Sequence, residues 1–182
     1  MTPVRFLLAG LALVPAWALA SSVIARTVGE RAKEADRVVL AQVLDSRTLV
    51  PQDDPRRMLT VTTVLVQESY KGSGPQRLEV VQLGGTHGLW EAHIPGDATF
   101  AAGEVALLLL RCGDPAHPAR CNLMALGEGK LLLVGEDVLL RSIAQNTFTR
   151  RKLAEVLAEI RAAVGLPLPV GEGKGEGTGV TR

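Results

Sequence analysis

The apolar residues of this chain gather in short runs that polar, glycine-rich or proline-rich segments interrupt. The longer runs cover residues 38–44, 58–70, 78–83 and 105–110, and shorter ones follow at 123–126, 131–134 and 138–140. Turn-forming glycines and acidic residues separate most of them. Short strands at such spacing predict a mainly β fold, built as a small antiparallel barrel or sandwich. The consecutive leucines of the 105–110 run further predict a strand that is buried on both faces.

Two of these strands change the parity of their apolar positions. In the second, the apolar positions change from odd at Val61 to even at Val64, so we expect a bulge at Thr62-Thr63. The third shows the same change between Val80 and Val81. Paired changes of this kind favour a sheet that coils and closes on itself, although a strand buried on both faces would show the same residues.

Two helices are expected, one at each end of this β region. Residues 21–35 contain helix formers but only a thin apolar stripe, which predicts a short, weakly docked helix. Residues 150–164 predict a clear amphipathic helix, with Thr149 as N-cap and Gly165 in the C′ position. Its apolar stripe should pack across one open end of the sheet; the stripe consists of Leu153, Val156, Leu157, Ile160 and Val164.

The first twenty residues have the pattern of a signal peptide. A weakly basic head is followed by the apolar run 6–16, and Ala18-Leu19-Ala20 supplies the small residues that a signal peptidase recognises. The alternative is a membrane anchor, but a spanning helix needs roughly 20 apolar residues, and this run is shorter. We therefore expect cleavage before Ser21 and a secreted or periplasmic product.

The rest of the chain predicts one domain and a tail. Residues 21–165 are enough for a single globular β-barrel domain with a helix at either end. Residues 166–182 are rich in glycine and proline and cannot bury enough apolar surface to offset the entropy of ordering them. They predict a disordered tail.

Charge argues against two classes of partner. Only Arg5 is charged within residues 1–20, so the remaining chain has 19 basic and 19 acidic residues and a formal net charge of zero. Nucleic-acid binding depends on an unneutralised basic surface, and attraction to anionic lipid depends on clustered cations. Neither partner is expected, and no membrane span is expected after cleavage.

The two cysteines predict a structural disulfide. Cys112 and Cys121 flank a segment rich in turn formers, and apolar runs lie on both sides of the pair. In an exported chain they would oxidise to a bond at the base of a hairpin loop. The alternatives, a redox pair or a metal site, fit less well, because redox pairs usually lie closer in sequence and a metal would need further ligands.

Candidate chemistry is sparse and concentrates in residues 84–100. His87 and His93, together with Glu91 and Asp97, are close enough in sequence to suggest a metal site, but their spacing matches no familiar ligand pattern. Trp90 is a candidate anchor for a partner. Ser73, the serine most closely flanked by small residues, lies in an expected hairpin turn rather than at a nucleophile elbow. We expect no catalytic residue, no metal and no cofactor.

A set of turns and apolar runs resembles a known type of protein. Tyr70-Lys71-Gly72, Gly84-Gly85, Phe100 before Gly103-Glu104, the 105–110 run and residues 125–130 occur in the order seen in certain exported bacterial proteins without an assigned activity. Their barrel is similar in outline to the OB-like fold of netrin modules and tissue inhibitors of metalloproteinases. The resemblance implies an OB-like barrel over residues 36–140 with the C-terminal helix packed against it. In the inhibitors an N-terminal cysteine binds the catalytic zinc, whereas the expected terminus here is Ser21-Ser22, so that activity does not carry over.

Three functional hypotheses follow. The first is a non-catalytic binding or structural module of the cell envelope or secreted fraction. The second is an inhibitor of a secreted protease that acts through the 84–100 loop, the longest irregular segment. The third is a hydrolase or metal enzyme that uses His87 and His93.

Overall fold

Five strands form the central part of the molecule. The computed structural model describes residues 26–52, 54 and 57–167; the expected signal peptide and residues 168–182 of the expected tail lie outside these residues. The central strands are β1 (Arg37–Leu49), β2 (Leu59–Lys71), β3 (Arg77–Leu83), β6 (Val105–Arg111) and β7 (Arg120–Leu123). None of the helices in the described part of the chain is long and apolar enough to span a bilayer.

These strands close into a small, uneven barrel. Their order is β1-β2-β3-β7-β6, and β6 also pairs with β1, which completes the ring. The closing contact between β3 and β7 is short and parallel, with only Glu79 opposite Arg120 and Val80 opposite Cys121. The prediction of a mainly β fold with a small barrel is confirmed. The expectation of a purely antiparallel sheet is wrong, because two strands that are far apart in sequence meet in parallel at this seam.

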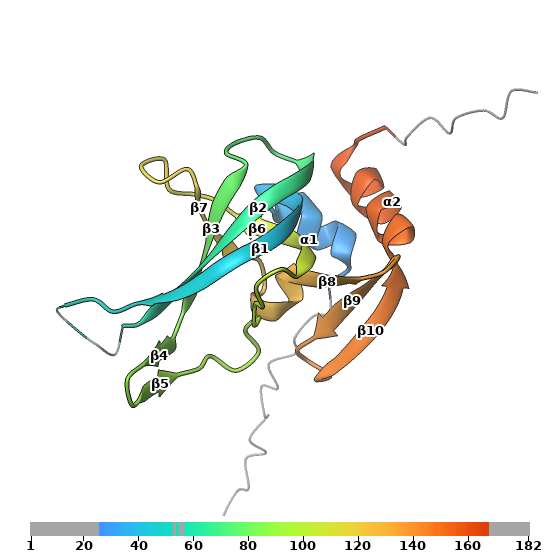
Figure 1. Ribbon diagram of the computed structural model, residues 1–182. Coiled ribbons are helices and arrows are strands. Elements are labelled where there is room, and N and C mark those ends of the chain that lie inside the picture. Colours follow the sequence, from blue (N-terminus) through green and yellow to red (C-terminus); the bar gives the residue numbers. More distant parts are fainter. Residues whose placement is uncertain (1–25, 53, 55–56, 168–182) are drawn as a thin grey trace, which may run out of the picture.

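The sheet continues beyond the barrel as a three-stranded extension. β6 pairs with β8 (Lys130–Val134) next to a single 3-10 turn, η1 (Leu126–Gly129), and β9 (Asp137–Ser142) and β10 (Thr147–Lys152) follow in antiparallel order. A separate two-stranded hairpin, β4 (Gly85–His87) and β5 (Trp90–Ala92), projects at one end of the barrel (Figure 1). The extension and this hairpin lie on different parts of the molecule.

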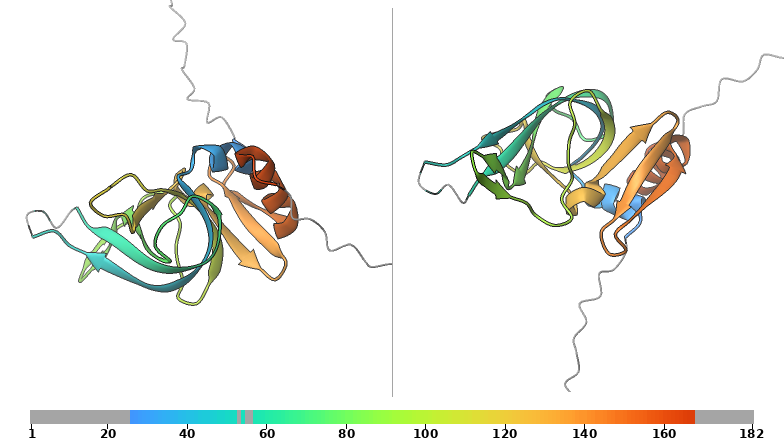
Figure 2. Two further views of the ribbon diagram at one scale, coloured as in Figure 1. Left: turned by 90° about the horizontal axis from the view of Figure 1, so that it is seen from above. Right: turned by 60° about the horizontal axis from the view of Figure 1, so that its bottom comes forward.

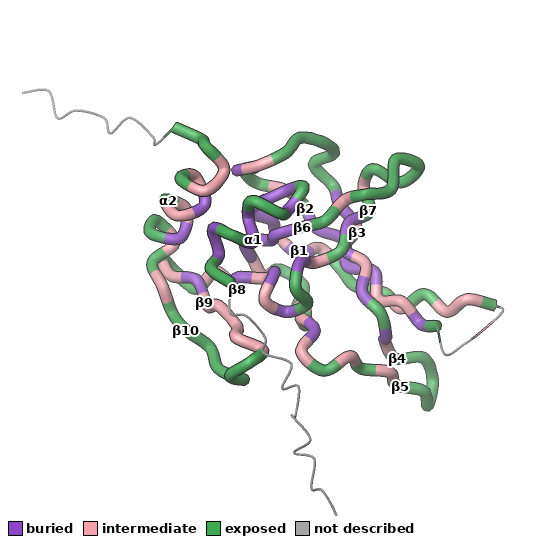
Figure 3. The backbone as a smooth tube through the Cα atoms, turned by 180° about the vertical axis from the view of Figure 1, so that it is seen from behind, coloured by how far each residue is buried: buried purple, intermediate pink, exposed green. Residues whose placement is uncertain are grey.

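Strands β1 and β6 divide the apolar interior into two clusters. Val39 and Leu108 point into the barrel, whereas Val38 and Leu109 point to its outer face, and all four side chains are fully buried. The predicted two-sided burial of the 105–110 strand is therefore confirmed. Figure 3 shows these strands as the buried centre of the chain.

Both helices pack on the outer face of the sheet. α1 (Val28–Glu34) begins with a capping box formed by Thr27 and Glu30, and α2 (Leu153–Val164) ends at Gly165 in the left-handed conformation. The helices lie side by side (Figure 2), and a Cβ placed on Gly29 would come within 3.2 Å of the Ala163 Cβ. α1 is thus closely docked, not weakly docked as expected.

The expected start of the C-terminal helix is wrong. α2 begins at Leu153, and Thr149 lies in β10 instead of serving as N-cap. The helix also covers the outer cluster through Val156 and Ile160, rather than an open end of the sheet. Residues 150–152 pair with β9, and this tertiary pairing overrides their helical preference.

The expected bulges also need correction. The register of β1 and β2 shifts at three places: it skips Leu44 on β1, opposite Val64 and Thr63, and it skips Gln67 and Tyr70 on β2. Strands β2 and β3 pair without a shift, and Val80 is buried while Val81 faces outward. The alternation on β3 is therefore regular.

The cysteine pair lies at disulfide distance. Cys112 and Cys121 have Cα atoms 4.3 Å apart. Cys112 directly follows β6 and Cys121 lies in β7, next to the pair of Arg111 with Asn122. The bond closes the loop between these strands, as the spacing of turn formers around it predicts.

Candidate functional site

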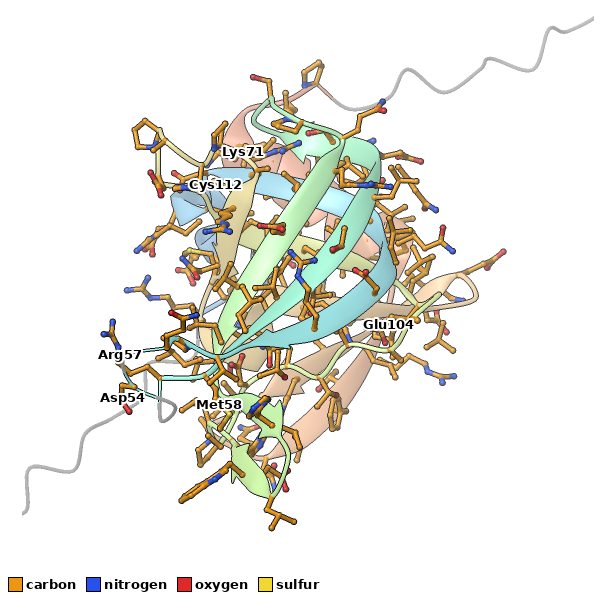
Figure 4. All side chains as sticks on the ribbon, turned by 60° about the vertical axis from the view of Figure 1, so that its left-hand side comes forward. Asp54, Arg57, Met58, Lys71, Glu104 and Cys112 are labelled. Carbon is orange, nitrogen blue, oxygen red and sulfur yellow. A yellow bond between two sulfur atoms is a disulfide. The ribbon has the colours of Figure 1, made fainter. Side chains whose placement is uncertain are left out.

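The 84–100 segment forms a hairpin and an irregular return segment over one end of the barrel. β4 and β5 pair in the order Gly85 with Ala92, Thr86 with Glu91 and His87 with Trp90. Figure 4 shows Met58 beside this hairpin, at the end of the barrel opposite Cys112. The segment expected to be irregular is therefore partly a two-stranded structure, which we call the β4–β5 hairpin.

Hydrogen bonds from the barrel hold the base of the hairpin. The Gly84 N–H donates to the Met58 carbonyl oxygen at 2.8 Å, and the Thr60 hydroxyl donates to the Gly84 carbonyl oxygen at 3.0 Å. The Thr86 N–H donates to the Thr48 hydroxyl at 3.3 Å. Gly84 has a φ of +94°, and a Cβ there would collide with the Ala92 carbonyl oxygen. Glycine is required here because the chain turns sharply against its own return strand.

A buried amide–carboxylate contact holds the return segment. The Gln82 side-chain amide donates to Asp97 Oδ1 at 2.6 Å and to the Ala98 carbonyl oxygen at 2.9 Å. The Ala98 N–H also donates to Asp97 Oδ1, and Arg141 donates to the Asp97 carbonyl oxygen. Because Gln82 and Asp97 are both more than nine-tenths buried, these bonds fix residues 97–98 against β3.

The two faces of the hairpin differ. Residues opposite each other in an antiparallel pair share a face, so Thr86 and Glu91 lie on one face and His87 and Trp90 on the other. The first face borders a polar pocket of about 240 Å³, and Trp90 and His87 do not line it. Hydroxyl, amide, carboxylate and imidazole groups line the pocket, among them Ser46, Thr60, Thr62, Gln82, Glu91, His93 and Asp97.

Of the four residues suggested as a metal site, Glu91, His93 and Asp97 border the same pocket, whereas His87 does not. His87 lies on the face opposite Glu91, and Asp97 is engaged with Gln82. Among residues 26–52, 54 and 57–167, no three His, Cys, Asp or Glu side chains come together to hold a metal ion. The suggested grouping of His87, His93, Glu91 and Asp97 is therefore not formed in this part of the chain.

Hydroxyl groups in the pocket bond to one another rather than to a base. The Ser46 and Thr62 hydroxyl oxygens are 2.8 Å apart and share a hydrogen bond. Within the described residues, the hydrogen bond between a histidine ring and a carboxylate is that of His117 with Asp114, which lies in the exposed disulfide loop. This bond holds the pKa of Asp114 below its usual value. The pocket therefore offers polar contacts but no paired nucleophile and base.

The tip of the hairpin exposes apolar side chains. Leu89 is fully exposed at 103% and Trp90 is 69% exposed. Beside the base, Leu49, Leu59 and Leu83 occupy one row across β1, β2 and β3, and Leu83 is 66% exposed. Sequence reasoning identified Trp90 but missed Leu89 and this row, because the row joins three strands that are distant in sequence.

Gln82 and Asp97 were also missed as a structural pair. Gln82 follows Leu78 and Val80 at the same parity, so it occupies an inward position of β3. A polar residue at such a position indicates that a partner exists, although the sequence does not say which residue it is.

Comparison with known proteins assigns neither a family nor a function to this chain. No protein-family model matches this sequence, and no curated protein matches it.

Proposed function

We propose that this protein is an exported, non-catalytic binding module that recognises another protein of the cell envelope or secreted fraction. The observation that carries the proposal is the pair of large apolar side chains, Leu89 and Trp90, exposed at the tip of the β4–β5 hairpin. Tryptophan is enriched among the residues that dominate binding energy at protein interfaces.

The anchoring of the hairpin supports this role. Bonds from Met58, Thr48 and Thr60 hold its base, so the tip is presented on a fixed support. A pre-ordered element loses less conformational entropy on binding than a flexible loop does. The exposed Leu83 at the end of β3 extends the apolar surface next to that base.

Compartment and charge support the rest of the proposal. The N-terminal residues have the pattern of a signal peptide, and a bonded cysteine pair persists in oxidising compartments. A net charge of zero outside residues 1–20 favours a protein partner over nucleic acid.

Affinity capture with matched variants tests the proposal. The immobilised protein would be incubated with envelope extract and with secreted protein, beside Leu89→Ser, Trp90→Ser and a Leu65→Ser control. Leu65 is an exposed leucine on β2, away from the hairpin. We expect a partner that the wild type and the control retain and that both tip variants lose. Retention of the same proteins by all four would contradict binding through the tip.

A second candidate function is inhibition of a secreted protease through the same hairpin. The fully exposed Leu89 favours it, because a narrow protruding tip with an apolar side chain can enter an enzyme cleft. Titration of the purified protein against a panel of secreted serine and metalloproteases tests this function. We expect stoichiometric slowing of one enzyme that Leu89→Ser relieves; unchanged rates at micromolar protein would reject it.

A further inference from the structure

Strand β10 leaves one row of backbone groups unpaired. It is the last strand in the order of the large sheet, whose other end closes on β6. The Leu153 N–H donates to the Glu136 carbonyl oxygen, which fixes the alternation of bonds in the β9–β10 ladder. In that alternation the N–H and C=O groups of Phe148 and Arg150 and the N–H of Lys152 point away from β9, whereas the Lys152 C=O belongs to the N-cap of α2 and accepts its first helical bond. Within the described residues, β9 is the one strand that pairs with β10.

The side chains of the same residues are also exposed. Phe148 is 68% exposed, and Figure 3 shows β10 as exposed along almost its whole length. Thr149 and Arg151 point to the opposite face, where Arg151 donates to Glu159 of α2 at 2.7 Å. The outward backbone groups and the exposed side chains of Phe148, Arg150 and Lys152 therefore form a single accessible edge, which we call the β10 edge.

The face beside this edge carries more positive than negative charge. Lys152 pairs with Asp137 at 3.0 Å and lies 3.8 Å from Glu136, and Lys130 pairs with Glu104. Arg150 is exposed and has no ion-pair partner among the described residues.

A second cation on this face, Arg141, has no carboxylate partner among the described residues. The Arg141 guanidinium lies 5.9 Å from the centre of the Phe148 ring, and its Nε is buried without a hydrogen-bond partner. A cavity of about 210 Å³ lies on the same face, with an apolar floor formed by Leu132 and Leu139. Two cations, Arg141 and Arg150, thus flank an apolar floor without a carboxylate partner of their own.

We propose that the β10 edge accepts an extended acidic segment of a partner protein, which adds a strand to the sheet. The backbone of that segment pairs with Phe148, Arg150 and the N–H of Lys152. A carboxylate of the segment lies opposite Arg150, and a neighbouring apolar side chain packs on Phe148 and the floor beside it. Main-chain bonds supply affinity in this mode of recognition, and alternate side chains supply specificity. This surface is separate from the β4–β5 hairpin and does not depend on the function proposed for it.

Charge distinguishes this occupant from a second copy of the chain. Two β10 strands that pair antiparallel about Arg150 place two unpartnered guanidinium groups opposite each other, and like charges at such positions are destabilising. Basic residues on an edge strand protect it from pairing with neutral or basic strands. The same charges attract an acidic one.

Peptide titration of the full chain provides the test. The probe is a short capped peptide in which glutamate alternates with valine, and its control replaces each glutamate with lysine. Amide resonances of the isotope-labelled protein would be followed at low salt. We expect the glutamate peptide to shift the amides of Phe148, Arg150 and Lys152 and to slow their hydrogen exchange, whereas the lysine peptide leaves them unchanged.

Charge reversal completes the test. Arg150→Glu should lower the affinity for the glutamate peptide about tenfold and should allow the lysine peptide to bind. Arg77→Glu, at an exposed arginine of β3, should leave the affinity for both peptides unchanged. Unshifted β10 amides at millimolar peptide would overturn the proposal. So would equal binding of both peptides, or a concentration-dependent dimer that occupies the β10 edge.

Discussion

The carboxylate of Glu159 connects three elements of the helical layer. It accepts hydrogen bonds from the Gly29 N–H of α1 and from Arg151 of β10, each at 2.7 Å, while Glu159 itself belongs to α2. Burial alone would raise the pKa of Glu159, but these two donors and the charge of Arg31 together outweigh it and hold the pKa below its usual value. The ionised carboxylate is therefore the form that stabilises the folded state.

Glu159→Gln should lower the free energy of unfolding at neutral pH, and this difference from the wild type should disappear in acid. A depressed folded pKa contributes stability that is complete above the unfolded value near 4.5 and is lost as the pH falls through the folded pKa. The side chain is partly exposed, so we expect a loss of about 1 kcal/mol at pH 7. Urea unfolding at neutral and acidic pH measures it. Glu155→Gln, at an exposed position of the same helix, is the control; an equal loss at both pH values would contradict this account.

Gly129 has no room for a side chain. A Cβ at this position would collide with the Met124 carbonyl oxygen and lie 2.9 Å from the Met124 nitrogen, both of which are backbone atoms. Gly129→Ala should therefore cost about 1–3 kcal/mol in the free energy of unfolding. Gly113→Ala is a matched control, because the space around Gly113 is open, and it should change stability by no more than about 0.5 kcal/mol. Equal effects would show that the turn at Gly129 relaxes freely.

At the scale of elements, local patterns predicted most strands but not how they meet. Apolar runs located β1, β2, β3 and β6, and Gly165 located the end of α2, because these depend on residues close in sequence. The parallel contact of β3 with β7 could not be predicted, since it joins residues about forty positions apart through two pairs.

The start of the C-terminal helix could not be predicted for the same reason. Residues 150–152 suit a helix by local preference, yet β9 supplies strand partners for all of them. The candidate site followed this pattern too. Its exposed Trp90 was visible in the sequence, whereas the bond between Gln82 and Asp97 depends on a fold that brings β3 and the return segment together.

The disulfide loop should stabilise the β6–β7 hairpin and, through it, the parallel seam. Cys112 and Cys121 are 9 positions apart, and closing a loop of this length is worth ~2.7 kcal/mol in the chain-entropy model. Replacing both cysteines with alanine should lower the free energy of unfolding by this order. Reductant should lower the free energy of unfolding of the wild type by a similar amount. It should leave that of the double variant unchanged, and the double variant therefore serves as the control. Insensitivity of the wild type to reductant, with its thiols shown to be free, would contradict the prediction.

At the scale of the whole molecule, the two proposed surfaces belong to different parts of the fold. The β4–β5 hairpin lies at one end of the barrel, and the β10 edge belongs to the extension that follows β6 (Figure 1). Both parts depend on β1 and β6, because each of these strands contributes side chains to both apolar clusters. The barrel and the helical layer are therefore built on one shared pair of strands.

This sharing predicts a single unfolding transition. Leu108 faces the barrel cluster and its neighbour Leu109 faces the helical layer, and both are fully buried. Leu108→Ala and Leu109→Ala should each cost about 2–5 kcal/mol. Each should also lower one common Tm, since neither cluster can lose β6 and remain folded. Calorimetry checks this through equal calorimetric and van't Hoff enthalpies in the wild type and both variants. Two transitions, with each substitution moving only one of them, would show that the clusters unfold independently and that β6 does not couple them.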